Sequence, residues 1–503
     1  MTTRGLAALA ERALKWSAAT TVARFALQLG AQVALARILG PDHYGVYGIG
    51  IAVLTFVAFL SGSSFSWNLM LLPAVDDDDI RFSFTWQIVV GSGCALAMYA
   101  AGPAVAVFFG DPRVEGMVQL LSLASLLTAA SAPATCLLQR DLNFRALGLI
   151  QLAGYAVGYL AVGVTMALRG WGPYALGTAA VVQAATVLLV SYAARPHPLR
   201  PLFSHRGGAA ALATGRTVFV TNVVNWFLGN IDRVLIGRVL NAQAVGLYNV
   251  AYNLASIPST LLLGALQPTF LATGARLQDD RHQLAQGWRL ALACVLVLAT
   301  PAAVVSALLA ADLVHLLYGP AWADSAWVLG LLFLCLPAWA CWGISTPVLW
   351  NTGRKHLEYM LQLPLLALAL PAWWIAAPSG IRAVAIVSAL VLAARAVVIV
   401  VAALRALRLR WQQAVAAPLL RGAALATACA LAVLAGQHAA AGSTLPGLAL
   451  AAGGAGALAV LALLAIWPQL LGAEVRGVAA RFLPFLGARP ATAFAATRPE
   501  GLR

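Results

Sequence analysis

The sequence contains about fourteen apolar stretches, each near 20 residues long, and these constrain the fold more than any other feature. A helix of that length crosses the roughly 30 Å hydrocarbon core of a bilayer. Lipid offers no hydrogen-bond partners to a polypeptide, so a crossing segment must pair its own backbone groups, as a helix does. The sequence therefore predicts an all-α polytopic membrane protein with about 14 transmembrane helices.

The predicted spans fall into three groups. The first half of the chain contributes residues 16–35, 47–70, 84–108, 117–137, 147–168 and 174–192. The second half contributes 218–240, 247–270, 290–309, 326–350, 359–375 and 383–403. Two stretches rich in alanine and glycine follow at 419–435 and 448–467. The predicted domains are an N-terminal six-helix bundle (1–194), a cytoplasmic linker (195–216), a C-terminal six-helix bundle (217–410), two additional helices (411–470) and a cytoplasmic tail (471–503).

Composition and charge support this interpretation. Only 10% of the residues are charged, against roughly 25% in a typical soluble domain. The net charge of +15 by itself is compatible with nucleic-acid binding. When the N-terminus is placed in the cytoplasm, however, most of the lysines and arginines fall in cytoplasmic loops, which is the asymmetry that orients membrane proteins. We therefore expect cytoplasmic N- and C-termini and no nucleic-acid partner.

Metal, cofactor and catalytic motifs are not evident in the sequence. The six cysteines are scattered through apolar segments without CxxC spacing, which is typical of buried small side chains. His43, His315 and His438 are isolated, and no HExxH, GxSxG or GxxxxGK[ST] motif occurs. The sequence thus predicts no cofactor, no metal and no enzymatic activity.

The two halves of the chain share a pattern. RILGPDHYGVYG at 37–48 and RVLNAQAVGLYN at 238–249 repeat an arginine, a leucine, a glycine and a tyrosine 201 residues apart (37 to 238). Gly110 and Gly319, and Gly172 and Gly380, follow in the same order at similar spacing. We infer an ancestral duplication. Because each copy holds an even number of spans, the copies are parallel repeats, an arrangement in which substrate sites lie near mid-membrane between the halves.

Polar residues interrupt the first helix of each repeat. They are Arg24, Gln28 and Gln32 in the first repeat, and Asn222, Asn225, Asp232 and Arg233 in the second. At 100° per residue, each set lies on one stripe of its helix. A charge facing lipid costs at least about 2.5 kcal/mol, so such residues normally face a bundle interior or a water-filled cavity. We predict that the two stripes line a cavity between the repeats.

The residue types indicate the ligand. Arginine presents a fixed fork of donors that suits phosphate, and amides suit sugars, so a lipid diphosphate carrying sugars is a plausible ligand. Two alternatives without a role in binding stay open at this point. In the first, the amides only join helices through interhelical hydrogen bonds. In the second, Asp232 and Arg233 form a local ion pair. Bends in the second repeat are expected at Pro337, Pro347 and Pro364.

The duplicated segments resemble a known family. LARILGPDHYGVYGIGIAV and NIDRVLIGRVLNAQAVGLYNVAYNLASIP resemble bacterial polysaccharide exporters, in the O-antigen and exopolysaccharide flippase branch of the multidrug/oligosaccharidyl-lipid/polysaccharide (MOP) exporter superfamily. QRDLNFRALGLI and NTGRKHLEYM resemble its cytoplasmic turns, and the resemblance covers roughly residues 10–410. One departure is that Asn241 and Ala242 stand where the first copy has Gly40 and Pro41.

The resemblance implies a MATE-like fold in a bacterial inner membrane. It also implies alternating access that moves undecaprenyl-diphosphate-linked oligosaccharides from the cytoplasmic to the periplasmic leaflet, for exopolysaccharide or lipopolysaccharide synthesis, alongside a polysaccharide polymerase and a chain-length regulator. Two rival functions are a cation-coupled multidrug antiporter of the same superfamily and a membrane-bound enzyme of polysaccharide synthesis. The antiporter is expected to place carboxylates inside a bundle, and the enzyme to carry a catalytic group in a sizeable loop.

Overall fold

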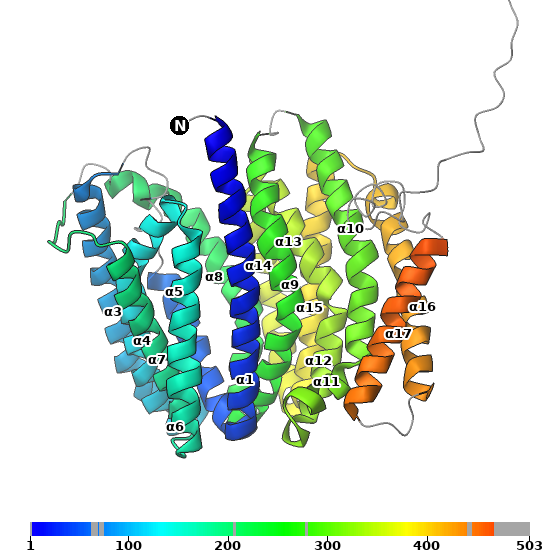
Figure 1. The fold of residues 1–503 in the computed structure, drawn as a ribbon, viewed down its shortest axis with the longest axis horizontal. Helices are drawn as coiled ribbons and strands as arrows, with labels where there is room; N and C mark the ends of the chain where they lie inside the picture. The colour runs from blue at the N-terminus through cyan, green and yellow to red at the C-terminus, as the bar shows by residue number, and fades with distance from the viewer. Residues whose placement is uncertain are drawn as a thin grey trace, which may run out of the picture. The chain divides into compact units, whose positions relative to one another are not determined.

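A computed structural model describes residues 3–61, 69, 75–204, 208–276, 280–439 and 445–466. Within these ranges the regular structure is helical, with no β-strand (Figure 1). Nine of the described helices are long and apolar enough to cross a membrane, or ten if one bent pair counts as a single span. The all-α polytopic fold is therefore confirmed, while the count of about 14 helices stays a prediction.

The first repeat begins with a long bent helix, α1 (Thr3–Ser61), which contains the first predicted span and residues 47–61 of the second. The bend lies at Gly40, whose φ of 73° and ψ of 174° are not helical. A side chain rarely adopts that φ, and Pro41, which follows, has no N–H to donate to the preceding turn. The Gly-Pro pair therefore ends one helical limb and begins the next.

The other helices of the first repeat lie beside α1 (Figure 1). They are α3 (Asp77–Phe109), α4 (Arg113–Arg140), α5 (Phe144–Tyr155) continued by α6 (Val164–Leu168), and α7 (Tyr174–Ala194). Asp76 caps α3, since its side chain accepts from the Asp79 backbone N–H at 2.7 Å while Asp79 caps it in return. Acidic residues at a helix N-terminus also stabilise the helix by interacting favourably with its dipole.

Between α5 and α6 the helix widens into a π-helical stretch, η1 (Ala156–Gly163). The sequence predicted an ordinary helix here, and π-helical turns are frequent at functional sites. Gly158 brings this stretch against α7, because a Cβ at that glycine would lie 2.6 Å from the Ala179 carbonyl oxygen. The hydroxyl of Tyr159, within the stretch, lies 2.6 Å from that of Tyr47 on α1.

The second repeat follows in the chain and is also built of helices. Its elements are α8 (Gly208–Val239), α9 (Ala242–Arg276), α10 (Arg281–Leu308), α11 (Ala310–Leu317), η2 (Pro320–Trp322), α12 (Asp324–Leu334), α13 (Leu336–Asn351), α14 (His356–Ala376), η3 (Ala377–Ser379) and α15 (Ile381–Leu407). Helix α8 begins ten residues before the predicted span, in an alanine-rich stretch of high helix propensity. Helices α12 and α13 meet at 43°, which confirms the bend predicted at Pro337.

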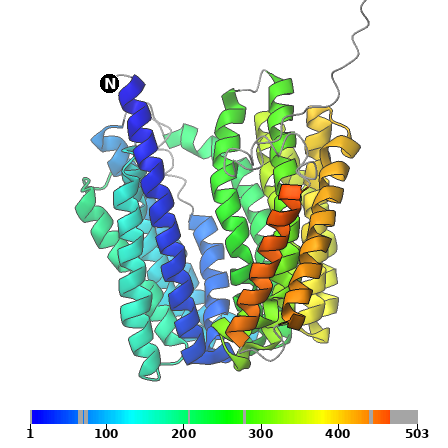
Figure 2. The same cartoon turned by 45° about the vertical axis from the view of Figure 1, so that its right-hand side comes forward.

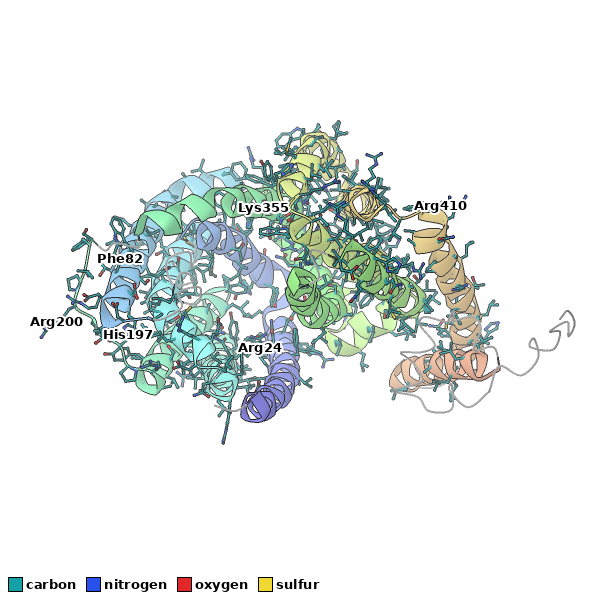
Figure 3. The ribbon with its side chains drawn as sticks, turned by 90° about the horizontal axis from the view of Figure 1, so that it is seen from above. Arg24, Phe82, His197, Arg200, Lys355 and Arg410 are labelled. Carbon is teal, nitrogen blue, oxygen red and sulfur yellow. The ribbon has the colours of Figure 1, made fainter. Side chains whose placement is uncertain are left out.

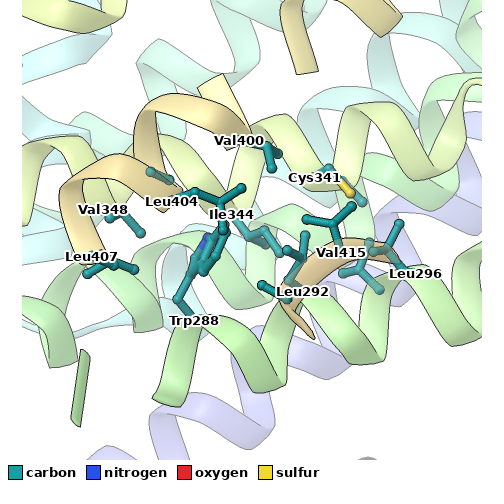
Figure 4. Packing of buried hydrophobic residues seen from close by; sticks show 14 of the residues in the cluster. Trp288, Leu292, Leu296, Cys341, Ile344, Val348, Val400, Leu404, Leu407 and Val415 are labelled. Atoms are coloured by element: carbon teal, nitrogen blue, oxygen red, sulfur yellow. The ribbon is translucent and has the colours of Figure 1, made fainter. Parts of the chain in front are cut away.

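Two further helices follow η4 (Gln412–Ala416): α16 (Ala417–Ala439) and α17 (Leu445–Ile466), which pack side by side (Figure 2). Gly422 lets α16 approach α10 closely, since a Cβ there would overlap the Leu296 carbonyl oxygen. Around α10 lies an apolar core centred on Trp288, which is fully buried (Figure 4).

The chain folds into two compact units. One comprises Met1–Asn253, Leu317–Val328 and Gln362–Val391; the other comprises Leu254–Leu316, Leu329–Leu361 and Leu392–Arg503. The first unit thus holds the first repeat and, from the second repeat, α8, η2, η3 and parts of α9, α11, α12, α14 and α15. The domain limits expected from the sequence stay a prediction.

Inside the first unit, the two repeats cross with twofold reciprocity. A Cβ on Gly45 would overlap the carbonyl oxygen of Ala242, and a Cβ on Gly246 would overlap the carbonyl oxygen of Pro41. Gly45 and Gly246 are equivalent in the two copies, as are Pro41 and Ala242. A contact in which i meets j and j meets i is the signature of a twofold axis, so this crossing supports the duplication.

Candidate functional site

A cavity of about 640 Å³ lies within the first repeat, between α1, α4, α5, η1 and α7. Its lining includes Gln139 and Phe144, on either side of the α4–α5 turn at residues 141–143, and we call this end of the bundle the Asp141 end. The opposite end, with the bend of α1, we call the Gly40 end. The polar side chains that line the cavity include Thr20, Arg24, Thr128, Ser131, Thr135, Gln139, Gln151 and Gln183.

Helix α4 contributes a continuous polar stripe to the cavity wall. Thr128, Ser131, Thr135 and Gln139 are spaced three to four residues apart, which places them on one helix face. The three hydroxyls donate to backbone carbonyls of their own helix, as Thr128 does to Ala124 at 2.8 Å. Their oxygens remain acceptors toward the cavity. This stripe was not among the residues predicted from sequence, although the three- to four-residue spacing within 128–139 indicates it.

Arg24 is the only charged residue among the described residues that line the cavity. Its guanidinium carbon lies 5.8 Å from the ring centroid of Phe25, and Figure 3 labels its position on α1. The part of the lining that the structure describes carries three glutamine amides and several hydroxyls but no carboxylate. A cation with neutral hydrogen-bonding neighbours favours an anionic, polyhydroxylated ligand and disfavours an organic cation.

The other residues expected at the site lie elsewhere. Gln28 is exposed and Gln32 is 9% exposed, and neither lines this cavity. On α8, Asn225 is half-buried, while the side chain of Asn222 lies outside the described part of the chain. The cavity predicted between the repeats stays a prediction, because the cavity described here belongs to the first repeat alone.

Asp232 is held in a buried network of the second repeat. Its Oδ2 accepts from the Tyr248 hydroxyl at 2.7 Å and from Ser388 Oγ at 3.0 Å, and its Oδ1 accepts from the Arg233 backbone N–H at 2.8 Å. Trp373 Nε1 in turn donates to Ser388 at 3.0 Å. The possible ion pair with the Arg233 guanidinium does not form. The carboxylate is instead satisfied by neutral donors from three helices.

At the Gly40 end, Arg113 ties the second limb of α1 to the α3–α4 turn. It donates to Asp42 at 3.0 Å and to Asp111 at 2.7 Å. Hydrogen bonds from this guanidinium hold the pKa of the Asp111 carboxyl below its usual value. On the same end, Arg37 Nε donates to the Leu317 carbonyl at 2.7 Å and Ser325 Oγ to the Leu247 carbonyl at 2.9 Å. Within the first unit, the bond from Arg37 to Leu317 joins the first repeat to the second at the Gly40 end.

At the Asp141 end, the segment after α7 packs along the start of α3. Thr85 Oγ1 accepts from the Leu202 backbone N–H at 2.8 Å, and Trp86 Nε1 donates to the Phe203 carbonyl at 3.1 Å. His197 lies between aromatic rings near the start of α3, with Arg200 farther out (Figure 3). Burial lowers the pKa of His197.

Comparison with known families decides where the chain belongs. A family model described as "Polysaccharide biosynthesis protein" matches residues 34–327, more than half of the chain. The chain belongs to this family. The match covers the reciprocal glycine crossing and the cavity wall from Ile51 onward, while the lining residues Thr20 and Arg24 precede it.

Individual relatives of this polysaccharide biosynthesis family are distant but extensive. The chain is 26% identical over 374 residues to the succinoglycan biosynthesis transport protein ExoT of Rhizobium meliloti, covering 74% of this chain and 72% of that protein. It is 23% identical over 319 residues to the lipopolysaccharide biosynthesis protein WzxC of Escherichia coli, covering 63% and 65%.

Solved structures show the same fold. The lipid II flippase MurJ in an inward closed conformation aligns with a TM-score of 0.71 at 12% identity, over 93% of this chain and 99% of that one. An inward-facing MATE-family multidrug transporter of the MOP superfamily aligns with a TM-score of 0.62 at 13% identity, over 76% and 94%. The MATE-like fold expected from the sequence is confirmed.

Proposed function

We propose that this protein is a flippase that moves undecaprenyl-diphosphate-linked oligosaccharides from the cytoplasmic to the periplasmic leaflet during exopolysaccharide or lipopolysaccharide synthesis. Family membership and the transport role in the name of ExoT support a function in polysaccharide export. The observation that carries the proposal is the cavity of the first repeat, where a single guanidinium faces amides and hydroxyls with no carboxylate among the described lining.

Arg24 binds the diphosphate in this proposal. A guanidinium stays charged and can donate two parallel hydrogen bonds to phosphoryl oxygens. The hydroxyls of α4 and the amides of Gln139, Gln151 and Gln183 then bind the proximal sugars. The prenyl chain remains in lipid, because its transfer to water would cost about 0.8 kcal/mol per CH₂.

The proposed movement of the repeats is inferred from the contacts at the two ends of the first unit. At the Gly40 end the repeats are joined by the glycine crossing and by bonds such as Arg37 to Leu317. The lining of the cavity includes Gln139 and Phe144 beside the turn at the Asp141 end. We infer that loading takes place from the Asp141 end and that the repeats then rock apart at the Gly40 end. The candidates for the later part of the path remain Gln28, Gln32, Asn222, Asn225, Asp232 and Arg233.

The finer assignments belong to the same proposal. The protein acts as a transporter and not as an enzyme, in the bacterial inner membrane, with both termini in the cytoplasm. The excess of lysine and arginine in the loops of the Asp141 end supports this orientation. A polysaccharide polymerase and a chain-length regulator are its proposed partners, because a translocated repeat unit must next be polymerised.

Reconstitution tests the function. The full chain in liposomes with a fluorescent lipid-diphosphate oligosaccharide is expected to move the label between leaflets. Arg24→Ala should slow transport at low substrate by at least about tenfold, as expected for the loss of a charge-assisted contact worth 1.5–3 kcal/mol. The matched control is Arg145→Ala, an exposed arginine beside the lining residue Phe144, which should transport like wild type.

The outcomes separate the candidates. Equal transport by wild type and Arg24→Ala would remove Arg24 from the mechanism. Uptake of an organic cation without movement of the sugar lipid would favour the multidrug antiporter. Release of a cleaved or extended sugar product would favour an enzyme.

A further inference from the structure

Two buried groups of N–H donors in the first helices of the repeats have no acceptor. On α8, the Nε and Nη2 atoms of Arg233 are buried without a hydrogen-bond partner, and on α1 the same is true of Gln32 Nε2. Gln32 and Arg233 occupy equivalent positions in the two copies, 201 residues apart. A buried donor left unpaired costs about 1–3 kcal/mol, and more when charged, so twin unpaired donors at related positions call for a physical reason.

The surroundings of Arg233 hold the side chain without neutralising it. The guanidinium carbon lies 3.6 Å from the ring centroid of Tyr252, and Nη1 donates to Asn230 Oδ1 at 3.2 Å. The neighbouring carboxylate, Asp232, already accepts from Tyr248, Ser388 and a backbone N–H. Among the ion pairs of the described residues, none involves Arg233. The fork is therefore pre-oriented, and no carboxylate of the described residues forms an ion pair with it.

The unpaired atoms share one chemistry, since all of them are donors. A group that only accepts hydrogen bonds, such as a phosphoryl oxyanion, satisfies them, whereas a hydroxyl or amide brings donors of its own. Phosphate recognition by arginine is favoured by the planar fork. A ligand of this kind would remove the cost of leaving Arg233 Nε and Nη2 buried without an acceptor.

The depth of these donors differs from that of the Arg24 cavity. Gln32 lies eight residues beyond Arg24 along α1, or about 12 Å toward the Gly40 end at 1.5 Å per residue. Arg233 occupies the equivalent level in the second repeat. Neither residue lines the cavity around Arg24, and the unpaired Arg233 atoms are covered by protein in this conformation.

We propose that Arg233, with Gln32, forms a second binding station for a phosphoryl anion, which opens when the repeats part at the Gly40 end. The diphosphate of the substrate passes from Arg24 to this station before release. This deepens the proposed function, because it assigns one arginine to loading and another to release. An inorganic anion such as pyrophosphate carries the same chemistry and serves as a probe.

Binding by the full chain in lipid nanodiscs tests the station without requiring transport. The probe is labelled pyrophosphate, with farnesyl diphosphate as a lipid-bearing arm and chloride as a competitor. In an Arg24→Gln background, saturable pyrophosphate binding should persist. Adding Arg233→Gln should weaken that remaining binding by about tenfold or more, and Arg233→Lys should weaken it less because charge is retained without the fork. The matched control is Arg238→Gln, an exposed arginine on the same helix over Phe108.

The farnesyl arm distinguishes the source of the anion. If farnesyl diphosphate binds more tightly than pyrophosphate, the station is assigned to the substrate lipid. If millimolar chloride displaces both probes, the station is assigned to a free inorganic anion, and the transfer role is overturned. Unchanged binding on adding Arg233→Gln to the Arg24→Gln background also overturns the proposal. Wild-type binding without any lipid transport leaves the anion station standing and refutes the flippase function instead.

Discussion

Replacement of Gly45 or Gly246 by alanine should destabilise the protein far more than the same change elsewhere on these helices. At either position the new Cβ would overlap a backbone carbonyl oxygen of the other repeat, Ala242 in one case and Pro41 in the other. A backbone cannot rotate away as the end of a flexible side chain can. Overpacking of this kind costs about 1–3 kcal/mol, and a backbone neighbour places the cost at the upper end of that range.

Gly30 supplies the matched control for this prediction. It lies on the first limb of α1, and a Cβ there would meet nothing within 4 Å. Gly30→Ala should therefore be neutral or stabilising by up to about 1 kcal/mol, the helix-propensity gain of alanine over glycine. The free energy of unfolding should therefore fall in Gly45→Ala and Gly246→Ala and stay the same or rise in Gly30→Ala.

Thermal unfolding of the purified protein in detergent, followed by loss of the monodisperse peak, measures the difference. Gly45→Ala and Gly246→Ala should each lower the unfolding temperature by roughly 5–10 °C, on the scale of 2–4 °C per kcal/mol for domains of 150–250 residues. The reasoning is refuted if Gly45→Ala and Gly30→Ala unfold at the same temperature. Because the crossing is reciprocal, a large effect at one glycine and none at the other would also contradict the twofold contact.

Three other outcomes are expected. Trp288→Ala should cost about 3–5 kcal/mol, since the ring is fully buried and Nε1 donates to Ser345 at 3.2 Å; an unfolding temperature equal to that of wild type would refute the packing. Tyr248→Phe should cost about 1–3 kcal/mol by removing a donor to buried Asp232, and the same assay checks it against Tyr99→Phe, an exposed tyrosine. Because burial lowers the pKa of His197 below 6.5, its packing against α3 is fully stable above that pH and weakens as pH falls toward the lowered pKa. The hydrogen-exchange protection of residues 195–204, taken relative to the intrinsic exchange rate at each pH, should therefore fall from pH 7.5 to pH 5, and His197→Phe should remove that fall.

Sequence alone determined the helical, membrane-spanning character of the chain, because the constraint is local: an apolar stretch in lipid must pair its own backbone groups. The sequence also indicated the duplication, because a residue at the crossing of the two repeats must be small enough for the other repeat's backbone to approach it. Gly45 and Gly246 recur for that reason, and the structure places each against the other copy's carbonyl. The bend at Pro337 was likewise local, as proline removes a backbone donor at its own position.

Arg24 was identified from sequence because a charge in a transmembrane helix is costly wherever its neighbours lie. Which partners surround such a charge is decided by tertiary packing. Only the structure showed that Thr128, Ser131 and Thr135 of α4 face Arg24 across one cavity. It also showed that Asp232 bonds to Tyr248 and Ser388, the latter from a helix more than 150 residues away, in place of its neighbour Arg233.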